Sequence, residues 1–135
     1  MPSKFDVKLS EDRVRIELYG SIDEPAAKEL EAEVLKVVEP LAPRSFEVMI
    51  SLAGAINCAL NARPVMARIQ QAFAQRARRT AYVDERPFMR GMALWVMHQV
   101  GDANAKAVST LDQAEQWLRG SDHREEAARL RTVAA

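Results

Sequence analysis

Apolar residues in this chain are spaced first with a period of two and then, repeatedly, with a period near 3.6. This alternation limits the fold more than any other feature. Residues 5–9 and 14–18 alternate apolar with polar side chains, which predicts two half-buried strands. Residues 10–12 between them form a loop of hairpin length. From 27 to 41, apolar residues recur every three or four positions, as in an amphipathic helix. The first 41 residues therefore predict a hairpin followed by a helix.

The alternation continues along the chain. Residues 46–52 (FEVMISL) form an almost uninterrupted apolar run, typical of a central strand buried on both faces. Further segments with helix or strand spacing follow at 62–76, 80–83, 88–100, 105–109 and 110–120. In this order they predict helix, strand, helix, strand and helix. Strands separated by helices need crossover connections, so we expect an α/β fold with a mostly parallel sheet of about five strands, an antiparallel N-terminal edge hairpin and about four helices.

Domain organisation follows from the same pattern. The chain has 135 residues, the length of one ordinary domain, and the predicted elements end near residue 120. Residues 121–135 are polar, with only a thin apolar stripe. We therefore expect one domain over 1–120 and a C-terminal tail over 121–135 that is a frayed helix or disordered.

Composition excludes several classes of function. Nineteen Lys and Arg residues balance nineteen Asp and Glu residues, so nucleic-acid binding is not predicted. One cysteine and two histidines cannot form a closed zinc site. The sequence has no Gly-rich phosphate loop, nucleophile elbow or HExxH motif, so we expect no enzyme activity, metal or cofactor. It also lacks a signal peptide and an apolar run of about 20 residues, which predicts a cytoplasmic protein with no transmembrane segment.

Charge is distributed unevenly. Residues 62–106 contain eight basic and three acidic residues, whereas residues 1–61 contain seven basic and eleven acidic residues. The arginines at 63–90 can serve to contact an acidic or phosphate-bearing partner, because the guanidinium fork matches carboxylate and phosphate geometry. They can equally be solvated helix faces. The sequence leaves both interpretations open.

Four stretches of sequence carry a family resemblance: GSID at 20–23, VMISLAG at 48–54, RTAYVD at 79–84 and LDQAEQWL at 111–118. Together with the order of elements, they resemble the STAS family and its SpoIIAA-like relatives, the fold of bacterial anti-sigma factor antagonists. The resemblance covers residues 5 to 120. It implies a noncatalytic interaction or ligand-binding domain, and the leading hypothesis is a module of a bacterial regulatory system that acts by binding another protein.

The sequence departs from the regulatory members of that family in the loop after the central strand. In those members, this loop carries a serine that a partner kinase phosphorylates. Here no Ser or Thr occurs between Leu52 and Arg76, so phosphorylation of a serine in this loop cannot act as a switch. The resemblance still implies that the loop is a partner-binding surface, and we expect its contact residues to be Asn57, Cys58, Asn61 and Arg63.

A few side chains invite a chemical interpretation, and each has a structural alternative that we weigh more heavily. Cys58 near a predicted helix start can be a stabilised thiolate or a small buried residue. His98 can be an acid or base, or a packed or surface histidine. Asp84 and Glu85 follow a strand at the carboxyl edge of the sheet, where ligands bind in many α/β folds, but they are also ordinary strand-ending residues.

The predicted helix over 88–100 is apolar on most of its circumference and is rich in methionine. Methionine side chains adapt to irregular or changing surfaces. Core filling is the commoner explanation, but Met66, Met89, Met92 and Trp95 can also line an apolar groove. Such a groove would take a partner helix, a lipid tail or a second copy of the protein. The alternative function is therefore a carrier or sensor of a small apolar ligand such as a lipid, and a homodimer is left open.

Overall fold

The computed structural model describes residues 4–120, so the expected tail over 121–135 lies outside the described residues. The strands are β1 (Phe5–Ser10), β2 (Arg13–Ile22), β3 (Phe46–Cys58), β4 (Ala77–Val83) and β5 (Ala105–Val108). The α-helices are α1 (Glu24–Val38), α2 (Arg63–Arg76), α3 (Pro87–Val100) and α4 (Leu111–Leu118). Short 3₁₀ helices, η1 (Glu39–Leu41) and η2 (Leu60–Ala62), precede β3 and α2.

One five-stranded sheet runs in the order β1-β2-β3-β4-β5, which makes β3 the central strand. The hairpin pair β1–β2 is antiparallel, and the other three pairs are parallel. The carboxyl ends of β2 to β5 therefore lie at the same end of the sheet. This topology confirms the expected α/β fold with an antiparallel N-terminal edge hairpin.

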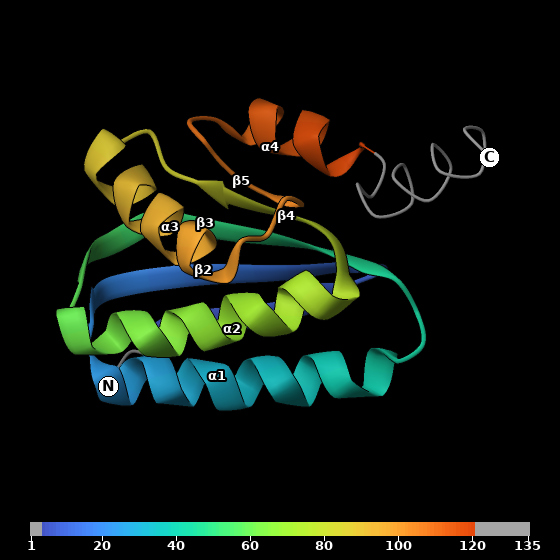
Figure 1. Ribbon diagram of the computed structural model, residues 1–135, viewed down its shortest axis with the longest axis horizontal. Coiled ribbons are helices and arrows are strands. Elements are labelled where there is room, and N and C mark those ends of the chain that lie inside the picture. Colours follow the sequence, from blue (N-terminus) through green and yellow to red (C-terminus); the bar gives the residue numbers. More distant parts are fainter. Residues whose placement is uncertain (1–3, 121–135) are drawn as a thin grey trace.

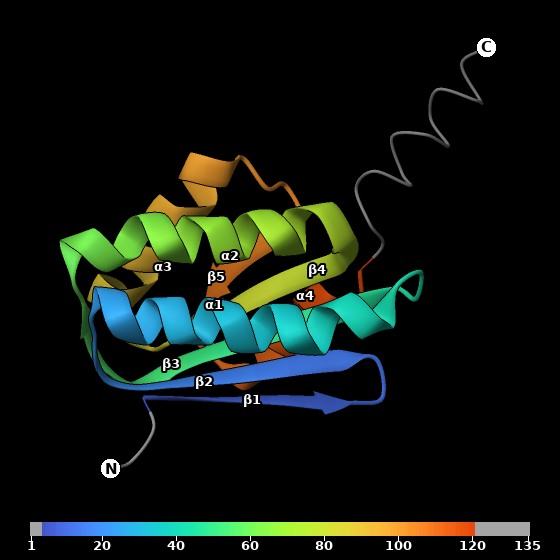
Figure 2. The same ribbon diagram turned by 90° about the horizontal axis from the view of Figure 1, so that it is seen from below.

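Helices cover both faces of the sheet, but unequally. Figures 1 and 2 show α1 and α2 side by side under one face, with α4 on the other. The main hydrophobic core includes residues of α1, α2 and α3 packed on the sheet, and a smaller cluster joins α4 to β3, β4 and β5. Because α4 has only eight residues, it covers the sheet near β3 to β5 and leaves the same face of β1 and β2 without a helix.

The central strand is buried on both faces, as its apolar run predicts. Val48 and Ile50 belong to the main core and are 0% and 2% exposed, while Met49 packs in the α4 cluster at 5%. Alternate side chains of a strand point to opposite faces, so this pattern places helices on both sides of β3.

Residues 53–61 are small and have no clear period, so the sequence predicts no strand there, yet β3 extends through the first six of them. The strand continues to Cys58, which pairs with Ile22 of β2. Two register shifts interrupt this pairing, and each adds a residue to β3, as in a β-bulge. These extra residues break the period of two, which is why the sequence does not predict a strand here. Gly54 lies at the first irregularity, where an added Cβ would stand 2.7 Å from Cδ1 of Tyr19.

Two of the helices begin at a polar side chain that caps the first turn. The Asp23 side chain accepts a hydrogen bond from the Ala26 amide and caps α1, and Thr110 with Gln113 forms a capping box on α4. Asparagine is a common helix cap, so the position of Asn61 directly before the predicted helix over 62–76 predicts that Asn61 caps this helix, and that prediction is wrong. Asn61 lies inside η2, and the N-cap of α2 is Ala62, which makes no side-chain cap hydrogen bond.

Candidate functional site

The connection from β3 to α2 carries the four residues expected to bind a partner. The main chain leaves the sheet at Cys58, and the Ala59 amide donates to the Ile22 carbonyl at 2.9 Å. Asn57 and Asn61 are exposed. Arg63, the first residue of α2, is partly buried, and its guanidinium carbon lies 5.9 Å from the centre of the Trp95 ring of α3.

Cys58 is set apart from the other three by its burial. Only 8% of the residue is exposed, and burial raises the pKa of its thiol more strongly than the charge of Arg63 lowers it. A protonated thiol is a poor nucleophile. The geometry therefore favours the small buried residue over the stabilised thiolate.

The β4–α3 loop is tied to the bulged half of β3 by the side chain of Arg86, in an arrangement that we call the Arg86 clamp. Nη2 of Arg86 lies 2.6 Å from Oδ2 of Asp84, and Nε donates to Oδ1 at 3.0 Å. The same Nη2 donates to the main-chain carbonyls of Leu52 and Ala55 at 2.8 and 2.7 Å. Since β4 stops pairing with β3 at Ser51, the guanidinium takes the place of a neighbouring strand beyond that point.

Asp84 is the buried carboxylate that accepts hydrogen bonds from Arg86 in this clamp. It is 3% exposed, and its hydrogen bonds with Arg86 lower the pKa of the carboxyl group. Arg90 also donates to the main-chain carbonyls of Asp84 and Glu85 at 2.9 and 2.8 Å. The Asp84 side chain thus positions the loop, and Glu85 is exposed beside it.

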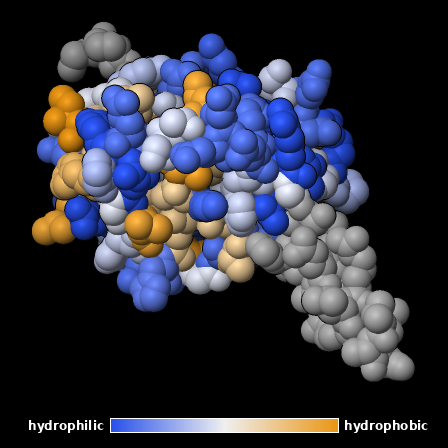
Figure 3. Space-filling view, turned by 90° about the horizontal axis from the view of Figure 1, so that it is seen from above, coloured by the Kyte–Doolittle hydropathy of each residue, from blue (hydrophilic) through white to orange (hydrophobic). Residues whose placement is uncertain are grey.

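Large apolar side chains stand in solvent at this end of the sheet. We define the apolar patch as Ile56, Leu60, Phe88 and Trp95, which are 65%, 78%, 65% and 38% exposed. Figure 3 shows apolar side chains gathering at the left, the end at which β3 leads into α2 and α3 begins. The patch thus includes the β3–α2 connection and the outer side of α3.

A pocket of about 360 Å³ opens at the same end of the sheet, on the side of α4. It is lined by residues within β3, at the end of β4 and directly after β4 and β5: Ser51, Ala53, Val83, Asp84, Glu85, Arg86, Ser109 and Leu111. The carboxyl edge of a parallel sheet is the usual place for a ligand in open α/β folds. Here, however, the Asp84 carboxylate is engaged by Arg86, so the lining side chains left to meet a ligand include the hydroxyls of Ser51 and Ser109 and the exposed Glu85 and Leu111.

The expected apolar groove is divided between core and surface. Met66, Met89 and Met92 are buried in the main core at 2%, 1% and 6% exposed, where α2 packs against α3. Trp95 lies on the outer side of α3 and belongs to the apolar patch. In this conformation the three methionines fill the core, and ligand binding between them stays a prediction.

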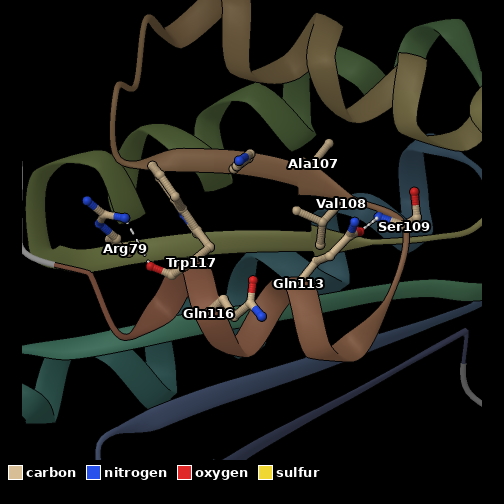
Figure 4. A pocket seen from close by; sticks show the side chains of 8 residues that line it. Arg79, Ala107, Val108, Ser109, Gln113, Gln116 and Trp117 are labelled. Atoms are coloured by element: carbon tan, nitrogen blue, oxygen red, sulfur yellow. Dashed lines mark hydrogen bonds between the residues drawn. The ribbon is translucent and has the colours of Figure 1, made fainter.

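A second hollow, of about 470 Å³, lies between β5 and α4, away from the β3–α2 connection (Figure 4). Arg79 and Trp117 stand at one end of it, with the guanidinium carbon 3.8 Å from the ring centre. Nη1 of Arg79 donates to the Trp117 carbonyl, and Nε1 of Trp117 donates to the Thr80 carbonyl, each at 3.0 Å. These contacts anchor α4 to β4 and give both side chains a structural role.

Two further observations concern metals and membranes. Over residues 4–120, no three His, Cys, Asp or Glu side chains are grouped so that they could hold a metal ion. His98 is exposed on α3. Within the same range, no helix combines the length and the apolar character needed to span a bilayer.

Sequence reasoning did not single out Arg86 or the exposed residues Ile56, Leu60 and Phe88. The acceptors of Arg86 are main-chain carbonyls of a distant strand, which no sequence motif specifies. A weak signal for exposure did exist, because Ile56 and Leu60 each directly precede an asparagine in an otherwise small and polar stretch.

Comparisons with known proteins were made at the levels of sequence and structure. No protein-family model matches the sequence, and no curated protein matches it. Among solved structures, a Shewanella loihica protein of the DUF3478 family, described as having a SpoIIAA-like fold, matches with a TM-score of 0.63 and 10% identity over 84% of this chain and 91% of its own.

Two anti-sigma factor antagonists give similar matches. The protein from Mycobacterium paratuberculosis has a TM-score of 0.61 and 19% identity over 89% of this chain and 98% of its own. The phosphorylated form of the Bacillus cell fate determinant SpoIIAA has a TM-score of 0.57 and 14% identity over 85% of this chain and 99% of its own. Given these matches and the sheet topology, this chain has the SpoIIAA-like fold of STAS domains.

Proposed function

We propose that this protein is a noncatalytic, cytoplasmic interaction module of a bacterial regulatory system. It binds another protein through residues 57–63 and the adjoining apolar patch. The fold is shared with anti-sigma factor antagonists, which supports a regulatory role of the same general kind. Because the identity of these matches is low, the binding surface is assigned from the chain's own residues.

The apolar patch is the observation that carries this proposal. Exposed apolar side chains that gather in one region are typical of protein-interaction sites, because their burial against a partner removes apolar area from water. Leu60, at 78% exposed, lies in the middle of the expected contact loop, between the exposed polar residues Asn57 and Asn61. An apolar centre with a polar rim is the usual composition of a protein interface.

We propose that the module is not controlled by serine phosphorylation within this loop. No Ser or Thr is present between Leu52 and Arg76, so the connection has no hydroxyl acceptor of either kind for a phosphoryl group. The loop is therefore always able to bind its partner, and regulation acts through the partner or through another part of the chain.

To test the contact surface, a partner is first captured by cross-linking in cells. Its affinity is then measured for the purified protein and for variants of it. We expect Leu60→Asp, Asn61→Asp and Arg63→Glu each to weaken binding, with at least about a tenfold loss for Leu60→Asp, equivalent to about 1.4 kcal/mol. Leu35→Asp is the matched control, since Leu35 is an exposed leucine of α1 outside the patch. A partner that binds all four variants as tightly as the original protein would show that the loop assignment is wrong.

The alternative function, a carrier of a small apolar ligand, rests on the packing of α3. Met66, Met89, Met92 and Met97 lie in the same core cluster, and their flexible side chains can repack around a guest molecule. Native mass spectrometry of gently purified protein distinguishes the two functions. A carrier retains a bound lipid, whereas an interaction module has the mass of its polypeptide alone.

A further inference from the structure

Strand β1 leaves a row of main-chain hydrogen-bonding groups at the edge of the sheet. No described element lies beyond it, and Figure 2 shows it along the outer edge. The Tyr19 amide donates to the Lys4 carbonyl at 2.7 Å, which fixes the phase of the ladder. Alternate residues of an antiparallel strand bond to the same neighbour. The N–H and C=O groups of Phe5, Val7 and Leu9 therefore point away from β2, toward the open edge.

The face of this hairpin that lacks a helix carries two rows of like charges. Asp6 lies opposite Glu17, and Lys8 lies opposite Arg15. Like charges that face each other across a sheet destabilise the pairing. On β1 itself, Nζ of Lys8 lies 3.3 Å from Oδ2 of Asp6. The hairpin thus presents one acidic row and one basic row, side by side.

We propose that two copies of this protein associate through their β1 edges, antiparallel, about a two-fold axis at Val7. In this register, Val7 of one copy faces Val7 of the other. Asp6 faces Lys8 on the face without a helix, and Phe5 faces Leu9 on the helix-covered face. The acidic row of each copy then continues into the basic row of the other, and the sheet becomes continuous across both.

The backbone and the charges select this register over its neighbours. A two-fold axis at Val7 pairs the outward-facing groups of Phe5, Val7 and Leu9 with one another, so the open edge is fully bonded. An axis at Asp6 would place Asp6 against Asp6, and an axis at Lys8 would place Lys8 against Lys8. Charged edge strands commonly prevent unwanted pairing. Here the same charges prevent the neighbouring registers and favour one.

The apolar side of the edge contributes to the same contact. Leu9 is 43% exposed, while Phe5 and Val7 are partly buried against the main core. Pairing Leu9 with Phe5 of the other copy removes part of this area from water. A six-residue edge strand buries less area than the roughly 800 Å² per partner of a standard interface, so we expect a reversible dimer. The dimer should weaken as added salt screens the ionic rows.

The proposal is tested by sedimentation velocity over a series of protein concentrations. The series extends to about 1 mM, because weak transient interfaces are populated at such concentrations. We expect the original protein to shift from monomer to dimer. Asp6→Lys and Lys8→Asp each place like charges across the two-fold axis, and each should remain monomeric. Both variants gain an opposite charge across from β2, at Glu17 or Arg15, so the hairpin itself should fold.

Mixing the two variants gives the sharpest result. An equimolar mixture of Asp6→Lys and Lys8→Asp restores opposite charges at both positions, so we expect a heterodimer from two monomeric proteins. Asp112→Lys on α4 and Lys36→Asp on α1 change the net charge equally at exposed positions and should dimerise normally. The proposal is overturned if the original protein stays monomeric throughout, if either β1 variant dimerises unchanged, or if the mixture stays monomeric.

Discussion

Nη2 of Arg86 donates a hydrogen bond to the main-chain carbonyl of Ala55 at 2.7 Å, although 31 positions separate the two residues. The bond joins the loop after β4 to the bulged half of β3, where the ladder between these strands has ended. Because Asp84 holds the same guanidinium, a buried carboxylate indirectly fixes the path of β3.

Replacement of Arg86 by alanine should destabilise the fold by about 2–3 kcal/mol, because it leaves the Asp84 carboxylate buried without its cation and frees the carbonyls of Leu52 and Ala55. Urea unfolding followed by circular dichroism measures the loss. Arg68→Ala is the matched control, since Arg68 pairs with Glu31 on the exposed surface of α2 and should contribute less than about 1 kcal/mol. Equal losses for the two variants would contradict a special role for the clamp.

Stability should fall in acid through carboxylates whose pKa is lowered in the folded state. Hydrogen bonds with Arg86 lower the pKa of Asp84, and hydrogen bonds with Arg13 lower that of Glu115. Such groups stabilise the fold fully above their ordinary pKa of about 4, and this contribution is lost as the pH falls through the lower folded value. We expect a nearly constant urea midpoint from about pH 7 to pH 5 and a decline below about pH 4. Asp84→Asn should make that decline shallower, and an unchanged slope would exclude Asp84 as a contributor.

Truncation of Ile50 tests the central position of β3. Ile50 is 2% exposed, and a large-to-small change in a packed core costs about 2–5 kcal/mol, so Ile50→Ala should lower the denaturation midpoint markedly. Leu60→Ala removes an equivalent side chain that is 78% exposed and should change stability by less than about 0.5 kcal/mol. An unmoved midpoint for Ile50→Ala would be incompatible with the observed packing.

Removal of residues 121–135 should leave a folded domain with nearly the same melting temperature. The apolar residues of this segment, Ala127, Leu130 and Val133, provide too little area to offset an ordering entropy of about 1–2 kcal/mol per residue. Differential scanning calorimetry of the truncated and complete chains measures the difference. If the truncated chain fails to fold at low concentration, the segment completes the core and the domain boundary at Gly120 is misplaced.

The order of elements could be predicted because burial imposes a period on the sequence. Val48, Met49 and Ile50 are apolar in succession because helices cover both faces of β3, and the run identifies a central strand. The hairpin strands alternate because one of their faces lacks a helix. Over residues 53–58, two bulges shift the side chains between faces, so the period is lost although the strand continues.

The candidate site was predicted only in part. The β3–α2 connection was located through a resemblance, and the burial of Cys58 was the favoured interpretation, but the exposure of Leu60 depends on the path of the main chain after the bulges. The helix over 88–100 is apolar on most of its circumference, which does not reveal that Phe88 at its start is 65% exposed. Periodicity does not distinguish an apolar side chain that packs in the core from one that is held in solvent for a partner.

The Arg86 clamp also affects the entropy of association at this end of the molecule. Ile56 follows Ala55 directly, and Phe88 lies two residues after Arg86, so one guanidinium fixes the main chain beside both side chains. Any molecule that docks on them meets a preorganised surface and does not have to immobilise two independent loops. Exchange of Arg86 for a shorter residue would therefore slow the formation of a complex as well as loosen the free protein, because the two segments would first have to find their common geometry.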